Sequence, residues 1–384
     1  MNKLNRREFV QTAGAFAAFP NLLDKDKPKD WLLYVGTYTA NTKSEGIYVY
    51  RMNAATGELK LASIAKGISN PAFLAIDAKR KFLYAANEIG EFLGKKGGGV
   101  TSFKIDQKTG ELKELNKVTS PGVPAHLSVH PSGKAVLAAN YGGGNIVIYP
   151  VKSDGSLGAA SDVAQHTGKG ADPKRQTEPH AHSVMLDEKG KYAFAPDLGI
   201  DKVMIYKVDA AKAKLKPSGF AATKPASGPR HFAFHPTYDY AYVICELSST
   251  MTAFSYDKDK GALTELQTIS TLPEGFKDTS YCADVHVHPS GKFLYGSNRG
   301  HNSIVIFAID QAGKLTLVGH ESTRGNWPRN FGIDPTGQFL LVANQNSNSV
   351  ATFKIDEQTG KLAPLGDLLE IPAPVCLKFI PAFS

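Results

Sequence analysis

From Trp31 onward, apolar and polar residues alternate over short stretches that are separated by turns containing Gly and Pro. The clearest stretch is CADVHVHPSG at residues 282–291, which continues into the aromatic and aliphatic stretch KFLYGSN at 292–298. A period of two residues is typical of a β-strand, and PSG is a tight-turn signal. Because helical periodicity is absent, the pattern predicts units of a strand, a turn and a second strand.

This unit recurs about every 45 to 55 residues, a period typical of solenoids and propellers. Clear copies are PAHLSVHPSG at 124–133, PRHFAFHP at 229–236 and PRNFGIDPTG at 328–337. Each copy continues into a third strand, such as SIVIFAID at 303–310, and then a further hairpin. The hairpins centre on a glycine followed two residues later by leucine, at Gly57, Gly110, Gly155, Gly261, Gly313 and Gly360, with residues 212–215 as a degenerate seventh. We therefore expect an all-β fold, a seven-bladed β-propeller with four-stranded blades.

The two ends of the repeat region complement each other. Residues 374–381 (PVCLKFIP) match the first strand of the repeat, after which the sequence stops. Residues 31–37 (WLLYVGT) match the missing second strand and lead into a third at 46–50. This predicts one blade that is shared between the terminal strands and that closes the ring without open edges.

Charged residues that interrupt the repeat are the candidates for function, because a purely structural repeat would place similar residues at equivalent positions. In the first strand, the position after the Pro (the axial position) reads Ala72, Ala125, His182, Arg230, Ala283, Arg329 and Val375. At the end of the second strand the series is Tyr38, Glu88, Tyr141, Leu198, Glu246, Arg299 and Gln345. First strands of a propeller line its central channel, so we expect the exceptions to converge there.

Five of these exceptions, His182, Arg230, Glu246, Arg299 and Arg329, come from four consecutive repeats. Burying charge is costly unless it is paired, so such a cluster favours an anion-binding site. The alternative is a structural network in which Glu246 neutralises arginines of neighbouring blades.

Other polar residues near these positions have weaker claims to a role. His130, His235 and His288 precede the turn proline and are interpreted as turn or core residues. His126 and His180 flank the axial position and could support it. The glycines at 142–144 lack a following helix and a Gly-Lys-Ser/Thr pattern, so they indicate a loop near the channel mouth rather than a phosphate loop.

Composition narrows the classes of function. The net charge of +8 suits attraction of anions, but the cations are mixed with acids rather than gathered in a basic helix, so we expect no nucleic-acid partner. Cys245, Cys282 and Cys376 lack metal-ligand spacing and are predicted to be buried thiols. No cofactor, metal or membrane-spanning segment is expected, and the oligomeric state is expected to be a monomer or dimer.

The N-terminal residues 1–23 contain Arg6-Arg7 before a short, weakly apolar stretch and resemble a twin-arginine export signal. Residues 24–30 alternate Lys and Asp and are interpreted as a linker to a propeller domain at 31–384. These features predict an exported or periplasmic protein. The alternative is a cytoplasmic protein with a frayed tail.

Several motifs resemble the lactonase family of seven-bladed propellers, which includes bacterial 6-phosphogluconolactonases and fungal carboxymuconate-lactonizing enzymes. The resemblance extends from Trp31 to Pro381 and rests on VGTYT (35–39), GIYVY (46–50), ANYGGGN (139–145), HAHS (180–183), GPRHF (228–232), CEL (245–247), DVHVHP (284–289) and SNR (297–299). It implies an active site of one histidine, two arginines and a glutamate. By motif these are His182, Arg230, Arg299 and Glu246.

The resemblance implies hydrolysis of a small anionic sugar lactone of the 6-phosphogluconolactone class. Glu246 or His182 would activate water and return the proton, and Arg230 and Arg299 would stabilise the oxyanion or hold an anionic group of the substrate. Further substrate contacts are expected from Arg329, His180, Glu88 and Tyr141. An export signal departs from the cytoplasmic members, which leaves the natural lactone open.

Two alternatives remain open from the sequence. The first keeps the site but reverses the chemistry, so that a carboxylate adds to a double bond as in the muconate-lactonizing relatives. The second is an exported propeller that only binds an anion or a partner, because a fold does not fix a function.

Overall fold

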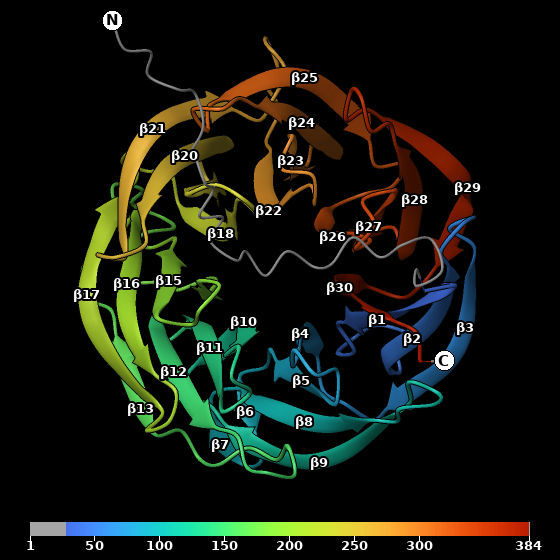
Figure 1. Cartoon of the computed structure of the whole chain (residues 1–384). Coiled ribbons are helices and arrows are strands. Elements are labelled where there is room, and N and C mark those ends of the chain that lie inside the picture. The colour runs from blue at the N-terminus through green and yellow to red at the C-terminus, as the bar shows by residue number, and fades with distance from the viewer. Residues whose placement is uncertain (1–27, 384) are drawn as a thin grey trace, which may run out of the picture.

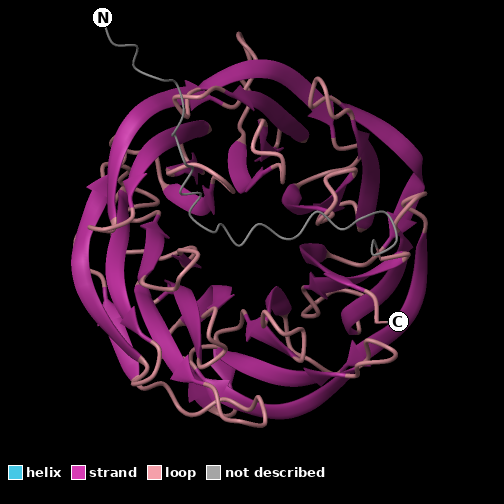
Figure 2. Ribbon diagram, viewed as in Figure 1, coloured by secondary structure: helices cyan, strands magenta, loops and turns pink. Residues whose placement is uncertain are grey.

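The described part of the computed structural model, residues 28–383, forms a closed ring of strands around a central axis (Figure 1). Seven four-stranded antiparallel sheets make up this ring. Figure 2 shows strands and loops only, and residues 28–383 contain no helix. The predicted seven-bladed β-propeller is therefore confirmed.

Each blade runs from a first strand at the axis to a fourth strand at the rim, and blades are numbered here in chain order. Blade 1 contains β4 (Pro71–Ile76), β5 (Phe82–Asn87), β8 (Gly99–Ile105) and β9 (Leu112–Thr119). Blade 2 contains β10 (Val123–Val129), β11 (Ala135–Gly142), β12 (Asn145–Pro150) and β13 (Asp162–Gln165). Blade 3 contains β14 (Met185–Leu186), β15 (Tyr192–Asp197), β16 (Lys202–Asp209) and β17 (Lys214–Ala222).

The remaining blades follow the same plan. Blade 4 contains β18 (Pro229–Phe234), β19 (Tyr240–Cys245), β20 (Thr250–Asp257) and β21 (Ala262–Ser270). Blade 5 contains β22 (Tyr281–Val287), β23 (Phe293–Arg299), β24 (Ser303–Ile309) and β25 (Leu315–Ser322), and blade 6 contains β26 (Pro328–Ile333), β27 (Phe339–Asn344), β28 (Ser349–Ile355) and β29 (Leu362–Glu370). An additional small hairpin of β6 (Glu91–Phe92) and β7 (Lys95–Lys96) interrupts blade 1.

Blade 7 joins the two ends of the described chain. It contains β30 (Pro374–Pro381) at the axis, followed by β1 (Asp30–Thr37), β2 (Gly46–Asn53) and β3 (Leu59–Lys66). β30 pairs antiparallel with β1, with Trp31 opposite Pro381 and Val35 opposite Leu377. The predicted sharing of one blade between the terminal strands is therefore confirmed.

The blades are held together by apolar side chains between neighbouring sheets. One cluster joins Ile244 and Met251 of blade 4 to Leu294 and Phe307 of blade 5. Because the inner strands have neighbours on both faces, they are apolar almost throughout, and every residue of β23 is buried. The fourth strand of a blade, such as β25, lies at the rim of the ring, and several of its residues are exposed to solvent.

Turn histidines form a second kind of tie between blades. Nε2 of His130, His235 and His288 lies within 3.0 Å of the backbone oxygen of Gly190, Gly291 and Gly337, respectively, in the first turn of the following blade. These glycines have φ between 69° and 78°, and a Cβ at Gly190 would lie 2.2 Å from the ring of His130. The interpretation of these histidines as turn or core residues is confirmed.

The three cysteines are buried free thiols, as predicted. Across the described chain, no helix is long and apolar enough to span a membrane. The predicted signal and most of the predicted linker, residues 1–27, lie outside the described residues.

Candidate active site

The axial positions of the repeat converge on one small cavity at the centre of the ring. Its walls include Ala72, Ala125, His182, Arg230, Arg329 and Val375, which are six of the seven axial residues, together with Phe73, Glu88 and His231. The seventh, Ala283, lies beside Arg230 and accepts a hydrogen bond from its Nη1 through the backbone oxygen. Charged residues from separate blades therefore meet in one place.

Glu246 is the hub of the charged cluster. It follows β19, and its Oε2 lies 3.0 Å from Nε of Arg230 and 2.7 Å from Nη2 of Arg299. Its Oε1 accepts from Nη2 of Arg175 at 2.8 Å. Burial would raise the pKa of this carboxyl, but Arg299 and Arg230 outweigh that effect and lower the pKa to about 2. Glu246 is thus an ionised group that aligns three guanidiniums.

The two deepest arginines keep donors free for a ligand. Burial and the neighbouring Arg299 lower the pKa of Arg230 to about 9, so it remains protonated at neutral pH. Nη2 of Arg230 and Nη1 of Arg299 have no hydrogen-bond partner within residues 28–383. Nε of Arg299 is also buried and unpartnered in this range. A buried donor such as Nε of Arg299 needs an acceptor, which a bound anion would supply.

His182 contrasts with Glu246 because its imidazole has no strong partner. Its backbone N–H donates to the oxygen of Pro196, and around it the first strand of blade 3 is reduced to the bridge between Ala181 and Asp197 and the short β14. Nδ1 is buried without a hydrogen-bond partner among the described residues. Burial, Arg230 and His231 hold the pKa of His182 well below its usual value. At neutral pH the imidazole is therefore in its neutral form.

The other predicted substrate contacts line the cavity wall or support it. Nη2 of Arg329 lies 3.6 Å from Oε1 of Glu88. Oε2 of Glu88 accepts a hydrogen bond from the hydroxyl of Tyr38 at 2.8 Å. The ring of Tyr141 lies 5.3 Å from that of His182 and stacks at 4.5 Å on His180. Nδ1 of His180 also lies 3.1 Å from the backbone oxygen of Tyr141, within hydrogen-bond distance. His180 therefore helps to position Tyr141, whose ring lies next to that of His182.

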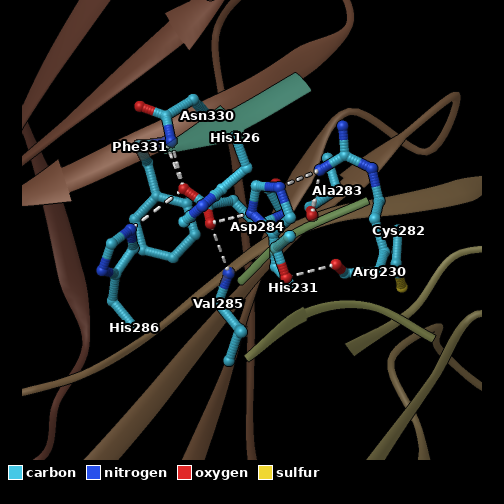
Figure 3. A network of polar contacts seen from close by, with 12 residues as sticks. His126, Arg230, His231, Cys282, Ala283, Asp284, Val285, His286, Asn330 and Phe331 are labelled. Carbon is cyan, nitrogen blue, oxygen red and sulfur yellow. Dashed lines mark hydrogen bonds and ion pairs between the residues drawn. The ribbon is translucent and has the colours of Figure 1, made fainter. Parts of the chain in front are cut away.

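A layer of polar residues lies one position further along the first strands (Figure 3). Nη1 of Arg230 donates to Nε2 of His231 at 3.2 Å, which requires the proton of His231 to be on Nδ1. Nδ1 of His231 then donates to Oδ1 of Asp284 at 2.7 Å. Oδ2 of Asp284 accepts hydrogen bonds from Nε2 of His286 and from Nδ2 of Asn330. Burial and Arg230 lower the pKa of His231 to about 4. Asp284 thus fixes the neutral tautomer of His231, which holds Arg230.

The chain resembles known proteins in both sequence and fold. The family model described as lactonase, seven-bladed β-propeller, matches residues 32–379. The chain belongs to this lactonase family. It is 39% identical over 90% of its length to the 6-phosphogluconolactonase of Bacillus subtilis, of which it covers 97%, and 32% identical over 85% to that of Pectobacterium carotovorum, of which it covers 93%. The periplasmic gluconolactonase PpgL of Pseudomonas aeruginosa superimposes with a TM-score of 0.87 at 36% identity, covering 92% of this chain and 99% of that structure.

Sequence reasoning missed two parts of this lactonase site. Asp284 and His231 lie one residue after an axial position, where the series reads Phe73, His126, Ser183, His231, Asp284, Asn330 and Cys376. Comparing repeats at that position would have revealed the exceptions. Arg175 lies outside the repeat, in the connection 166–184, which is the longest between blades. The length of that insertion was the available signal.

The charges of the lactonase site do not balance. Four guanidiniums, of Arg175, Arg230, Arg299 and Arg329, accompany the carboxylates of Glu88, Glu246 and Asp284. The pKa values of His126, His182 and His231 are lowered, chiefly by burial, so these rings add no positive charge at neutral pH. Within residues 28–383, no group of three or more His, Cys, Asp or Glu side chains could hold a metal ion. The arrangement therefore favours a ligand with at least one negative charge.

Proposed function

We propose that this chain hydrolyses a small anionic sugar lactone of the 6-phosphogluconolactone class. The observation that carries the proposal is the neutral, unpartnered imidazole of His182 in the same cavity as Arg230, which is held with Arg299 by Glu246. A proton acceptor beside free guanidinium donors is what hydrolysis of an ester requires. The names of the curated relatives and the excess of positive charge support an anionic lactone.

In the proposed mechanism, His182 removes a proton from water as the water oxygen attacks the lactone carbonyl. The oxyanion of the tetrahedral intermediate accepts hydrogen bonds from the free donors of Arg230 and Arg299. When the carbonyl carbon–ring oxygen bond breaks, protonated His182 returns the proton to the departing ring oxygen. The products are the open-chain acid and His182 in its neutral form.

Glu246 is assigned a different task from the base. Both carboxylate oxygens of Glu246 are committed to guanidiniums, whereas Nδ1 of His182 has no hydrogen-bond partner among the described residues. Glu246 instead keeps the guanidiniums of Arg230 and Arg299 pointed at the cavity. Of the two candidate bases from the sequence, we therefore favour His182.

The test is a pH-stat assay of lactone opening, corrected for spontaneous hydrolysis. His182→Ala, Glu246→Gln and Arg299→Ala should each lower kcat/KM by roughly 100-fold or more, as expected for loss of a general base or an oxyanion donor. His130→Ala, whose side chain ties two turns at a distance from the site, is the matched histidine control and should retain activity. Wild-type turnover in all three folded site variants would refute the assignment.

A muconate assay, followed by ultraviolet absorbance, separates hydrolysis from the reverse chemistry. We expect lactone opening and no cyclisation of a muconate. Binding of gluconate-type ligands without turnover of any lactone would instead favour a binding module.

We further propose that the chain is exported. The proposal is supported by the Arg6-Arg7 segment of the sequence and by a similar protein described as periplasmic. Fractionation of cells that express the full chain should place lactonase activity in the periplasm, and Arg6→Lys with Arg7→Lys should abolish that localisation. Cytoplasmic activity with the intact sequence would contradict export.

A further inference from the structure

Arg175 is the cation of the site that lies outside the propeller repeat. Its loop, residues 166–184, is held firmly against blade 3. Oδ1 of Asp172 accepts from the backbone N–H groups of Lys174 and Arg175 at 2.8 and 3.0 Å. The side chain of Gln176 is buried and donates to Leu198 and Asp201 at 2.7 Å. Arg175 is therefore presented by a rigid loop, even though it belongs to no strand.

From this loop, Arg175 reaches across to blade 4. Its Nη2 donates to Oε1 of Glu246 at 2.8 Å and to the hydroxyl of Tyr141 at 3.3 Å. Its Nε and Nη1 have no hydrogen-bond partner among residues 28–383. Half of the guanidinium is thus engaged with the site and the other half is free.

Exposure separates the four arginine side chains by depth. Those of Arg230 and Arg299 are 1% and 6% exposed, that of Arg329 is 18% exposed, and that of Arg175 is 37% exposed. The two deep arginines flank the carbonyl site proposed above, and Arg329 is paired with Glu88. In a phosphorylated sugar lactone, the phosphate is on the carbon most distant from the reacting carbonyl. Its partner should therefore lie nearer the solvent than the oxyanion donors.

We propose that Arg175 binds the phosphate of the lactone and so makes the site select phosphorylated over unphosphorylated sugar lactones. The inference rests on the proposed function, because it assigns a substrate group to the same site. A guanidinium forms paired, charge-assisted hydrogen bonds with phosphate. While Nη2 remains on Glu246, Nε and Nη1 supply the donors for the phosphate oxygens.

The experiment compares 6-phosphogluconolactone with unphosphorylated gluconolactone in wild type, Arg175→Met and Lys174→Met. Lys174 is the adjacent exposed residue of the same loop, so its substitution changes the net charge equally without touching the site. Loss of a charge-assisted hydrogen bond corresponds to roughly a 10- to 100-fold effect. We expect Arg175→Met to lower the ratio of kcat/KM for the two lactones by that factor, mainly through KM of the phosphorylated one.

The ratio isolates recognition from catalysis. Any effect of Arg175 exerted through Glu246 alters both lactones alike and cancels. Arg175→Lys, which retains the charge but not the planar donor set, should restore part of the ratio, and Lys174→Met should retain the wild-type ratio. An unchanged ratio in Arg175→Met would overturn the inference while leaving the proposed function in place.

Calorimetry with 6-phosphogluconate and gluconate tests the same inference without turnover. Arg175→Met should weaken binding of the phosphorylated ligand selectively. If wild type opened neither lactone, the proposed function would fail, and selective weakening would still support phosphate binding by Arg175. Equal weakening for both ligands would overturn the inference.

Discussion

Two arcs of the central cavity differ in chemistry although the repeat gives them the same backbone position. Blades 7, 1 and 2 place Val375, Ala72 and Ala125 there, and we call these residues the apolar arc. Blades 3, 4 and 6 place His182, Arg230 and Arg329 there, which form the charged arc. The same backbone position of the repeat therefore carries small apolar side chains in some blades and charged or ionisable side chains in others.

The charged arc needs support that the apolar arc does not. Burying a guanidinium without a counter-charge is costly, and Arg230 is accordingly bound by Glu246, His231 and the backbone oxygen of Ala283. Alanine and valine need no such partners. Their small side chains form the opposite wall of the cavity.

The largest expected effect comes from converting part of the charged arc to the apolar type. Arg230→Ala should reduce kcat/KM roughly 100- to 1,000-fold, because an oxyanion donor is lost and Glu246 loses a partner. Lactone hydrolysis and thermal unfolding should be measured together to confirm that the variant is folded. Arg324→Ala, at an exposed arginine, is the control. A folded Arg230→Ala enzyme with normal kcat/KM would remove the functional distinction between the arcs.

A smaller effect is expected when the apolar arc is filled. Ala125→Leu should obstruct the cavity and lower kcat/KM for the lactone roughly 10-fold, mainly through KM. Ala125→Ser adds a single atom and should remain close to wild type in steady-state kinetics. If Ala125→Leu had no effect on KM, the lactone would have to bind away from the apolar arc.

The smallest effect is expected on the stability of the fold at low pH, through His126, which follows Ala125 of the apolar arc. His126 is buried 4.0 Å from the ring of Phe73, and burial together with His231 holds its pKa well below the usual value. Its folded form stays neutral while the unfolded chain takes up a proton below about pH 6.5, so stability is lost as pH falls below that value.

His126→Phe removes the histidine that takes up a proton on unfolding. The free energy of unfolding should therefore fall less steeply with decreasing pH than in wild type. Urea unfolding at pH 7 and pH 5 should show a smaller decrease in the free energy of unfolding than in wild type, by up to about 1.4 kcal/mol per pH unit. Equal decreases in the two proteins would show that His126 is not neutral in the folded state.

The strands and the axial residues could be predicted because the repeat makes them comparable. Alternation and turn glycines located the blades, and departures at one aligned position identified His182, Arg230 and Arg329. The hairpin β6–β7 and the loop that carries Arg175 are insertions without a counterpart in other blades, so no comparison could predict them.

The division of labour between Glu246 and His182 was also beyond the sequence. Both residues are ionisable, and either could have been the base. The choice depends on how many guanidiniums surround each group, because three arginines hold Glu246 ionised while His182 is left without a partner. The fold brings these groups together although residues such as Arg175 and Glu246 lie far apart in the sequence.

The pairing of β30 with β1 has a consequence for biosynthesis. Val375, at the start of β30, completes the wall of the cavity, yet it follows the strands of all the other blades along the chain. Blades 1 to 6 can form before β30 has been synthesised, but the ring cannot be sealed until β30 pairs with β1. Catalytic competence should therefore appear only once β30 has been made and paired, as a single late event.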